Sequence, residues 1–188
     1  MDSALIKYVN ESLSAELREI STSKRAGYEN GLTIHEKAII YHYTDSGYDS
    51  LNERLRNGQD INDFGLFLNY SLDKLPDYQA LCYRTIRCPK RDLEKYYSAL
   101  SNNGIIIEKS FLSCSKSRLL ALYFSDSPLF IILSKRGKDI EKIAKFGVDS
   151  GQNEREIVFK SGSRFKVLDI KEAENKITIT LEEIKKWI

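Results

Sequence analysis

Helix-like and strand-like patterns occupy separate parts of this 188-residue chain, and this separation limits its fold more than any other feature. Up to about residue 75, apolar residues such as Leu5, Val9 and Leu13 recur at helical spacing. From Leu81 onward, short β-branched and aromatic runs alternate with turn residues. Because helices and strands are segregated along the chain, the sequence predicts an α+β fold.

Local signals indicate where the elements of both parts begin and end. Thr33 and Glu36 fit a capping box, Gly58 is typical of a helix end, and Pro76 terminates a helix expected over 61–74. Strands are expected over 81–87, 105–107, 111–113, 129–133, 157–159, 165–170 and 177–181. We therefore expect one domain over 1–188, with a helical lobe over about 1–75 and a β-rich core over about 76–188.

Charge and cysteine content exclude several classes of protein. Lys and Arg number 29 against 27 Asp and Glu, and a net charge of +2 does not favour binding to nucleic acid or membranes. The chain has three cysteines, Cys82, Cys88 and Cys114, which is an odd number and includes no CxxC pair. Neither a disulfide framework nor a zinc site is therefore expected. Residues 1–11 carry charges and no long apolar run, so we expect neither a signal peptide nor a membrane anchor.

Two carboxylates stand close together at Glu154 and Glu156, just before the apolar run from Ile157 to Phe159. We expect this segment to be a strand in which the two side chains share one face about 6–7 Å apart, because alternate residues of a strand point the same way. Glu156 is then expected at the solvent-exposed mouth of a partly apolar surface. In such a pair, one carboxylate can hold a substrate while the other accepts a proton. The alternative is a solvated pair that protects a strand edge.

A strand arginine and a serine pair form a second set of candidates. Arg84 lies inside a predicted strand, where its guanidinium must find a partner. That partner is either a phosphate or carboxylate ligand, or an acidic residue of the core. Ser113 and Ser115 flank Cys114 at alternate strand positions, so their hydroxyls share a face and can orient a carboxylate.

Other polar residues have simpler interpretations. His35 and His42 fall in the helical part, away from the serines and Cys114, and we expect each to be a packed or surface histidine. The basic loop from Lys135 to Lys138 either binds phosphate or is a solvated turn.

Three short motifs follow one another along the chain, namely Tyr83-Arg84, Ser113-Cys114-Ser115 and Glu154-Arg155-Glu156. In this order they resemble the motifs of mono-ADP-ribosyltransferases of the Arg–Ser–Glu class, which have an arginine strand, a Ser-Thr-Ser strand and Glu-x-Glu. The resemblance covers roughly residues 41–170. Residues 104–115 support it because they resemble the family's run into the serine strand, and residues 165–168 resemble the strand that follows the glutamates. Cys114 stands where the family has Thr, at a position expected to point away from the shared face.

The resemblance implies a helical lobe packed on a mixed β-sandwich core that binds NAD, which is consumed as a cosubstrate without a metal. It implies that Arg84 binds the phosphates, with Tyr83, Ser113 and Ser115 in the same NAD-binding region. Ser113 orients Glu156, which stabilises the oxocarbenium-like transition state as nicotinamide leaves.

The resemblance also bears on the acceptor. In the family, a glutamate two residues before the catalytic glutamate goes with arginine acceptors, so Glu154 is expected to engage an arginine of a target protein. The loop from about Phe146 to Asn153 corresponds to the acceptor-recognition loop, and its Gly and Ser content predicts a mobile turn. Phe146 is the aromatic candidate there, although Gly151 occupies the nearer position where the family often has an aromatic. This departure leaves the identity of the acceptor open.

Three functions remain open from the sequence: a protein-arginine ADP-ribosyltransferase, an NAD glycohydrolase with water as acceptor, and a non-enzymatic interaction domain. We expect the first, with a protein rather than a nucleic acid as acceptor. We also expect a monomer that acts in the cytoplasm of the producing or the target cell, as a phage modifier or the catalytic piece of a toxin. If the protein is secreted, something outside this chain must arrange it.

Overall fold

The computed structural model describes residues 1–125, 127–174 and 176–185, and the chain divides into two compact units. The first unit comprises 1–76 and 138–156, and the second comprises 77–137 and the residues from 157 onward. Residues 138–156 were expected in the β-rich part, whereas their contacts place them with the helices of the first unit.

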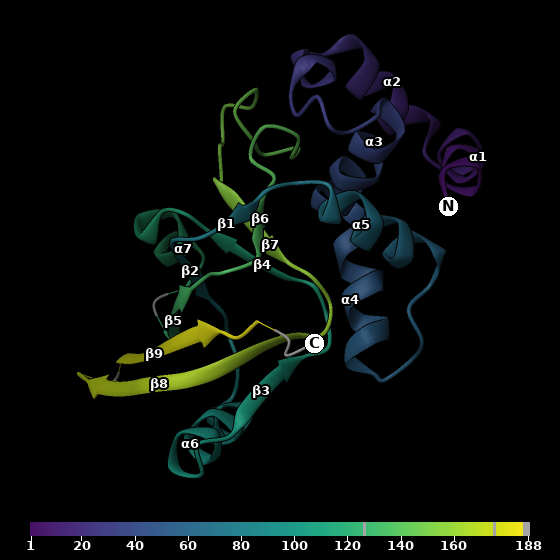
Figure 1. Ribbon diagram of the computed structural model, residues 1–188. Helices are drawn as coiled ribbons and strands as arrows, with labels where there is room; N and C mark the ends of the chain where they lie inside the picture. Colours follow the sequence, from purple (N-terminus) through teal and green to yellow (C-terminus); the bar gives the residue numbers. More distant parts are fainter. Residues whose placement is uncertain (126, 175, 186–188) are drawn as a thin grey trace. The chain divides into compact units, whose positions relative to one another are not determined.

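The first unit is helical, and its elements are drawn from purple to blue in Figure 1. They are α1 (Asp2–Ser12), α2 (Ser14–Thr22), the 3₁₀ helix η1 (Lys24–Gly27), α3 (Ile34–His42), the π-helical turn η2 (Tyr43–Gly47), α4 (Tyr48–Arg56) and α5 (Asp63–Asp73). The capping box before α3 is present, since the Thr33 side chain accepts from the Glu36 amide and the Glu36 carboxylate accepts from the Thr33 amide. Gly58 adopts φ 75° just after α4, as expected for a glycine at a helix end.

The second unit contains most of the sheet and three short helical elements, whereas the strand residues 138–139 and 156 belong to the first unit. The strands are β1 (Asp77–Tyr78), β2 (Leu81–Thr85), β3 (Ile105–Glu108), β4 (Leu112–Ser115), β5 (Leu129–Leu133), β6 (Gly137–Asp139), β7 (Glu156–Phe159), β8 (Ser163–Ala173) and β9 (Lys176–Glu183). The helical elements are η3 (Lys90–Leu93), α6 (Glu94–Ser101) and α7 (Arg118–Phe124). The short strands β1 and β6 were not expected from the sequence, because neither contains an apolar run.

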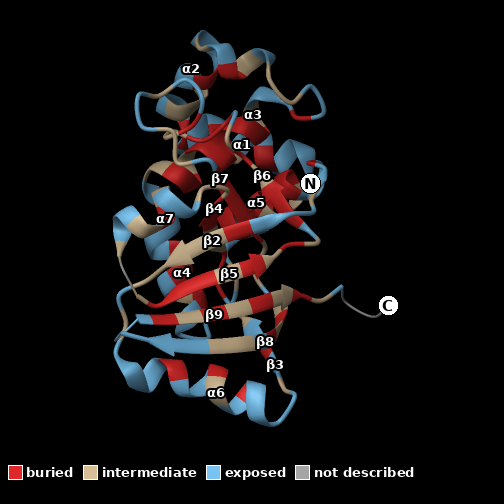
Figure 2. Ribbon diagram, turned by 90° about the vertical axis from the view of Figure 1, so that its left-hand side faces the viewer, coloured by how far each residue is buried: buried red, intermediate tan, exposed pale blue. Residues whose placement is uncertain are grey.

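All nine strands found in the described residues belong to one mixed sheet in the order β1-β6-β7-β4-β2-β5-β9-β8-β3. β5 pairs antiparallel with β2 and parallel with β9, and the long β8–β9 hairpin is antiparallel. The apolar run 129–133 is therefore an interior strand, as the sequence predicts, and most of β5 is coloured as buried in Figure 2.

The sheet folds over on itself, so that strands distant in the hydrogen-bonded order share one core. Phe159 of β7 and Phe165 of β8 are separated by four strands in that order, yet their ring centroids lie 5.2 Å apart. The two residues also share a buried cluster with Cys82, Cys114 and Ile132. The predicted α+β class with a mixed, sandwich-like β core is thus confirmed. Among the described residues, no helix is long and apolar enough to span a membrane.

Candidate active site

Arg84 and Ser113 are brought together although 29 residues separate them. Arg84 lies in the middle of β2, half-buried, and its Nη1 donates a hydrogen bond of 2.6 Å to the main-chain oxygen of Ser113. The acceptor is a carbonyl of the neighbouring strand rather than a core carboxylate, which was the alternative interpretation of this arginine. The hydrogen bond orients the guanidinium, and the group has further N–H donors that can bind phosphate oxygens.

The two serines of β4 differ in burial. Ser113 is half-buried, whereas Ser115 is buried and its Oγ accepts from the amide of Ser117 at 3.0 Å. Ser115 is also the register partner of Tyr83 across the β2–β4 ladder. Cys114 points to the opposite side, into the buried core cluster, as expected for the position that differs from the family motif.

The backbone between Glu154 and Glu156 is not an extended strand. β7 begins only at Glu156, and Arg155 adopts the left-handed conformation with φ 52°. A non-glycine residue in this region costs about 1–2 kcal/mol, and it breaks the alternation of side chains along a strand. The prediction that Glu154 and Glu156 occupy alternate positions of one strand face is therefore wrong.

Glu156 and Glu154 also differ in environment. Glu156 is only 9% exposed, and β7 is buried along its whole length, so the prediction of a solvent-exposed mouth is wrong as well. Glu154 is half-buried, and this burial raises the pKa of its carboxyl above the ordinary value because the charged form loses hydration. A raised pKa makes Glu154 a better proton acceptor than an exposed glutamate.

The strands that carry Glu156, Ser113 and Arg84 are consecutive in the sheet. β7, which from Ile157 onward belongs to the second unit, is a hydrogen-bonded neighbour of β4, and β4 is paired with β2. Residues from three distant parts of the sequence are therefore carried by three adjacent strands.

The segment 140–153, drawn in green in Figure 1, is bound to the helices of the first unit. The buried Arg25 donates from Nε to Ile143 O at 3.1 Å, and from Nη2 to Ala144 O and Lys145 O, both at 3.2 Å. The Lys145 amide in turn donates to Oγ1 of Thr44 at 2.9 Å. Specific side chains therefore hold the main chain of 143–145, just before the stretch 146–153 for which composition predicts a mobile turn.

Gly147 lies so close to the main chain of Glu141 and Ala144 that it leaves no room for a side chain, and this gives a first testable prediction. A Cβ atom at Gly147 would overlap the main-chain oxygen of Glu141 and lie 2.9 Å from that of Ala144. We expect Gly147→Ala to lower the free energy of unfolding by about 1–3 kcal/mol, because the segment must shift to make room. Urea denaturation measures the change.

Gly151 provides the matched control, because nothing lies within 4 Å of a Cβ atom built there. Gly151→Ala should change the free energy of unfolding by less than about 0.5 kcal/mol. Equal destabilisation by the two alanines would contradict the close approach at Gly147.

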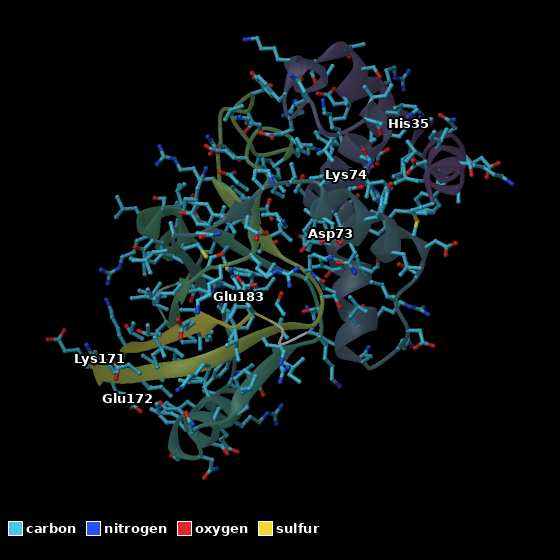
Figure 3. All side chains as sticks on the ribbon, in the orientation of Figure 1. His35, Asp73, Lys74, Lys171, Glu172 and Glu183 are labelled. Carbon is cyan, nitrogen blue, oxygen red and sulfur yellow. The ribbon has the colours of Figure 1, made fainter. Side chains whose placement is uncertain are left out.

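Both histidines lie in the helical unit, and His42 has structural partners. Nδ1 of His42 lies 2.8 Å from the Glu16 carboxylate and its ring packs against Phe64, so His42 is a packed histidine as expected. His35, labelled in Figure 3, is half-buried on α3.

The loop from Lys135 to Lys138 binds a carboxylate of its own chain. Glu183, buried at the end of β9 and labelled in Figure 3, accepts hydrogen bonds from the amides of Lys135 (2.8 Å) and Arg136 (2.7 Å). Nζ of Lys138 is buried and donates to Leu75 O at 2.7 Å. The main chain of this loop and the Lys138 side chain therefore have structural partners, which neither the phosphate-binding nor the solvated-turn interpretation predicted. The sequence signal that could have indicated it is the acidic pair Glu182-Glu183 at the end of a strand.

Comparison with known proteins agrees with these observations. Residues 18–78 match the family model described as ADP-ribosyltransferase exoenzyme. The chain is 30% identical over 153 residues to Mav of Mycobacterium avium (strain 104), whose name gives NAD(+)–arginine ADP-ribosyltransferase as an inferred activity. That alignment covers 76% of this chain but only 18% of Mav, so the chain spans less than a fifth of this relative's length.

Solved structures show the same fold at low sequence identity. Exoenzyme S of Pseudomonas aeruginosa, in a complex with human 14-3-3 protein beta and carba-NAD, superimposes with a TM-score of 0.77 at 18% identity over 97% of this chain and 88% of that chain. The ADP-ribosyltransferase Vis in complex with agmatine, from Vibrio splendidus, gives a TM-score of 0.62 at 20% identity over 94% of this chain and 86% of that chain. The chain is thus similar to ADP-ribosyltransferases in its fold, in residues 18–78 and in the stretch that aligns with Mav.

Proposed function

We propose that this protein is a mono-ADP-ribosyltransferase that transfers ADP-ribose from NAD to an arginine side chain of a target protein and releases nicotinamide. The observation that supports the proposal most is the order β2-β4-β7, in which adjacent strands carry Arg84, Ser113 and Glu156. The complexes of exoenzyme S with carba-NAD and of Vis with agmatine support NAD as donor and a guanidinium as acceptor. We also propose that the two units form one catalytic domain that acts as a monomer in the cytoplasm.

NAD would be bound by residues of β2 and β4. Nη1 of Arg84 holds the Ser113 carbonyl, and its other N–H groups are suited to the pyrophosphate as a planar fork. Tyr83 and Ser115, partners across the ladder, would contribute to the same surface.

Glu156 would stabilise the positive charge that develops on the ribose as the bond to nicotinamide breaks. Its carboxylate belongs to a buried strand, where an anion fixed before the reaction stabilises charge more than one in water. Ser113, on the neighbouring strand, would orient this carboxylate by a hydrogen bond.

Glu154 would act on the acceptor. The carboxylate would pair with the arginine guanidinium and accept the proton that the attacking nitrogen loses as it bonds to the ribose carbon. Burial of Glu154 and the resulting rise in its pKa favour this role. Phe146, whose main-chain oxygen accepts from the Glu154 amide, would contribute to acceptor recognition.

The decisive experiment is incubation of the purified protein with NAD and agmatine, followed by mass spectrometry. We expect ADP-ribosyl-agmatine and nicotinamide in equal amounts, and with a cell lysate we expect arginine-linked labels that hydroxylamine releases. NAD loss without a modified acceptor would instead indicate an NAD glycohydrolase. Absence of NAD turnover would indicate an interaction domain.

The pKa of Glu154 leads to a second prediction, on pH. Since burial raises this pKa and transfer needs the ionised carboxylate, transfer to agmatine should fall as the pH decreases through a value above about 4.3, the ordinary glutamate pKa. Nicotinamide release without agmatine does not need Glu154 and should persist to lower pH. Initial rates of both reactions, measured between about pH 4 and 8, test this, and coincident acid limbs would contradict it.

A further inference from the structure

Hydrogen bonds connect residues 140–146 to the segment that carries the two candidate glutamates. The Ile140 amide donates to Glu156 O at 3.1 Å, and the Glu154 amide donates to Phe146 O at 2.8 Å. A third bond runs from Nδ2 of Asn153 to Oε1 of Glu141 at 2.6 Å. The first two join main-chain groups and are open to any sequence, whereas the third joins two side chains and so depends on residue identity.

Asn153 makes a second bond at the point where the backbone is strained. Its Oδ1 accepts from the amide of Arg155 at 2.9 Å, and Arg155 is the left-handed residue between Glu154 and Glu156. The side-chain amide of asparagine is both donor and acceptor, so Asn153 can hold Glu141 and Arg155 at once. An ionised aspartate has the same shape but could only accept.

Glu154 depends on this arrangement more than Glu156 does. Glu156 is the first residue of β7 and is buried with the rest of that strand. Glu154 precedes the strand and is separated from it by the turn at Arg155. A change at Asn153 should therefore displace Glu154 while the β7 strand keeps Glu156 in place.

We propose that Asn153 and Glu141 are positioning residues that fix Glu154 for the transfer step, an inference that rests on the proposed function. Neither residue needs to touch NAD or the acceptor. Both act through the backbone of 154–155, and their loss should change the partition of NAD between transfer and hydrolysis.

An exchange of donor and acceptor between the two residues tests the proposal. Asn153→Asp keeps the acceptor for the Arg155 amide but sets two carboxylates against each other, and Glu141→Gln keeps an acceptor oxygen for Asn153. The double variant Asn153→Asp/Glu141→Gln restores one hydrogen bond with its direction reversed. Asn10→Asp, on an exposed position of α1, introduces the same chemical change elsewhere.

We expect Asn153→Asp to lower transfer to agmatine by about tenfold or more, with nicotinamide release in the absence of agmatine changed by less than about threefold. Glu141→Gln and Asn10→Asp should stay within about threefold of wild type in both reactions, and the double variant should regain most of the lost transfer. A general loss of folding would reduce both reactions alike, so the ratio of transfer to hydrolysis separates positioning from instability.

Two results would overturn the inference while the proposed function stands. In the first, the wild type modifies agmatine and Asn153→Asp does so equally well. In the second, Asn153→Asp loses both reactions in parallel and the exchange restores neither. If the wild type releases nicotinamide but modifies no agmatine, the proposed function fails, and the role of Asn153 in transfer fails with it.

Discussion

Replacement of Glu156 by glutamine should abolish both transfer to agmatine and nicotinamide release, with losses of about 10³-fold in each. Glutamine keeps the size of the side chain and removes its charge. The transition state then lacks the anion that balances the developing charge on the ribose, which both reactions share. Initial rates of nicotinamide release and of ADP-ribosyl-agmatine formation measure the effect.

The stability of the Glu156→Gln variant must be checked because the residue is buried. A neutral amide is easier to bury than a carboxylate, so we expect a melting temperature within about 4 °C of wild type. Glu53→Gln, an exposed change on α4, should leave both rates unaltered. Retention of more than about a tenth of the wild-type rate by Glu156→Gln would remove Glu156 from the centre of the mechanism.

Glu154→Gln should separate the two reactions. We expect transfer to agmatine to fall by about 10²-fold or more, because the amide can neither pair with the guanidinium as an anion nor accept its proton. Nicotinamide release without an acceptor should change by less than about threefold, since Glu154 takes no part in cleavage of NAD. The two rates measured on one preparation give the comparison directly.

The pH profile provides the internal control for Glu154→Gln. Residual transfer in this variant should lose the acid limb assigned to Glu154, whereas the hydrolysis profile should match that of wild type. Equal losses of transfer and hydrolysis would contradict the acceptor role of Glu154. Transfer that persists unchanged would mean that another group receives the proton.

Features set by neighbouring residues in the sequence were predictable. The capping box of Thr33 and Glu36, the end of α4 near Gly58 and the interior strand 129–133 were all expected from local chemistry, and the structure contains each of them. These features follow from main-chain hydrogen bonding and apolar runs within a few residues. Such local signals were sufficient to predict the α+β class.

Features set by distant contacts were not predictable in the same way. The amide of the left-handed Arg155 donates to Asn153, and Asn153 donates in turn to Glu141, twelve residues earlier. The sequence Glu-Arg-Glu-Ile-Val reads as a continuous strand, and only the tertiary bonds show the turn within it. Likewise, Glu183 and the loop amides that it binds are about 47 residues apart, and no periodicity links them.

In the proposed transferase, the bonds that hold both ends of the segment 140–156 have a consequence for acceptor selection. A free loop loses about 1–2 kcal/mol of conformational entropy per residue when it becomes ordered. Here that loss occurs as the chain folds, so the interaction energy of an arriving acceptor is not consumed in ordering the loop. A rigid recognition surface also discriminates by shape, whereas an adaptable one accommodates many partners. We therefore expect the proposed transferase to modify a narrow set of arginines within its target rather than every exposed guanidinium.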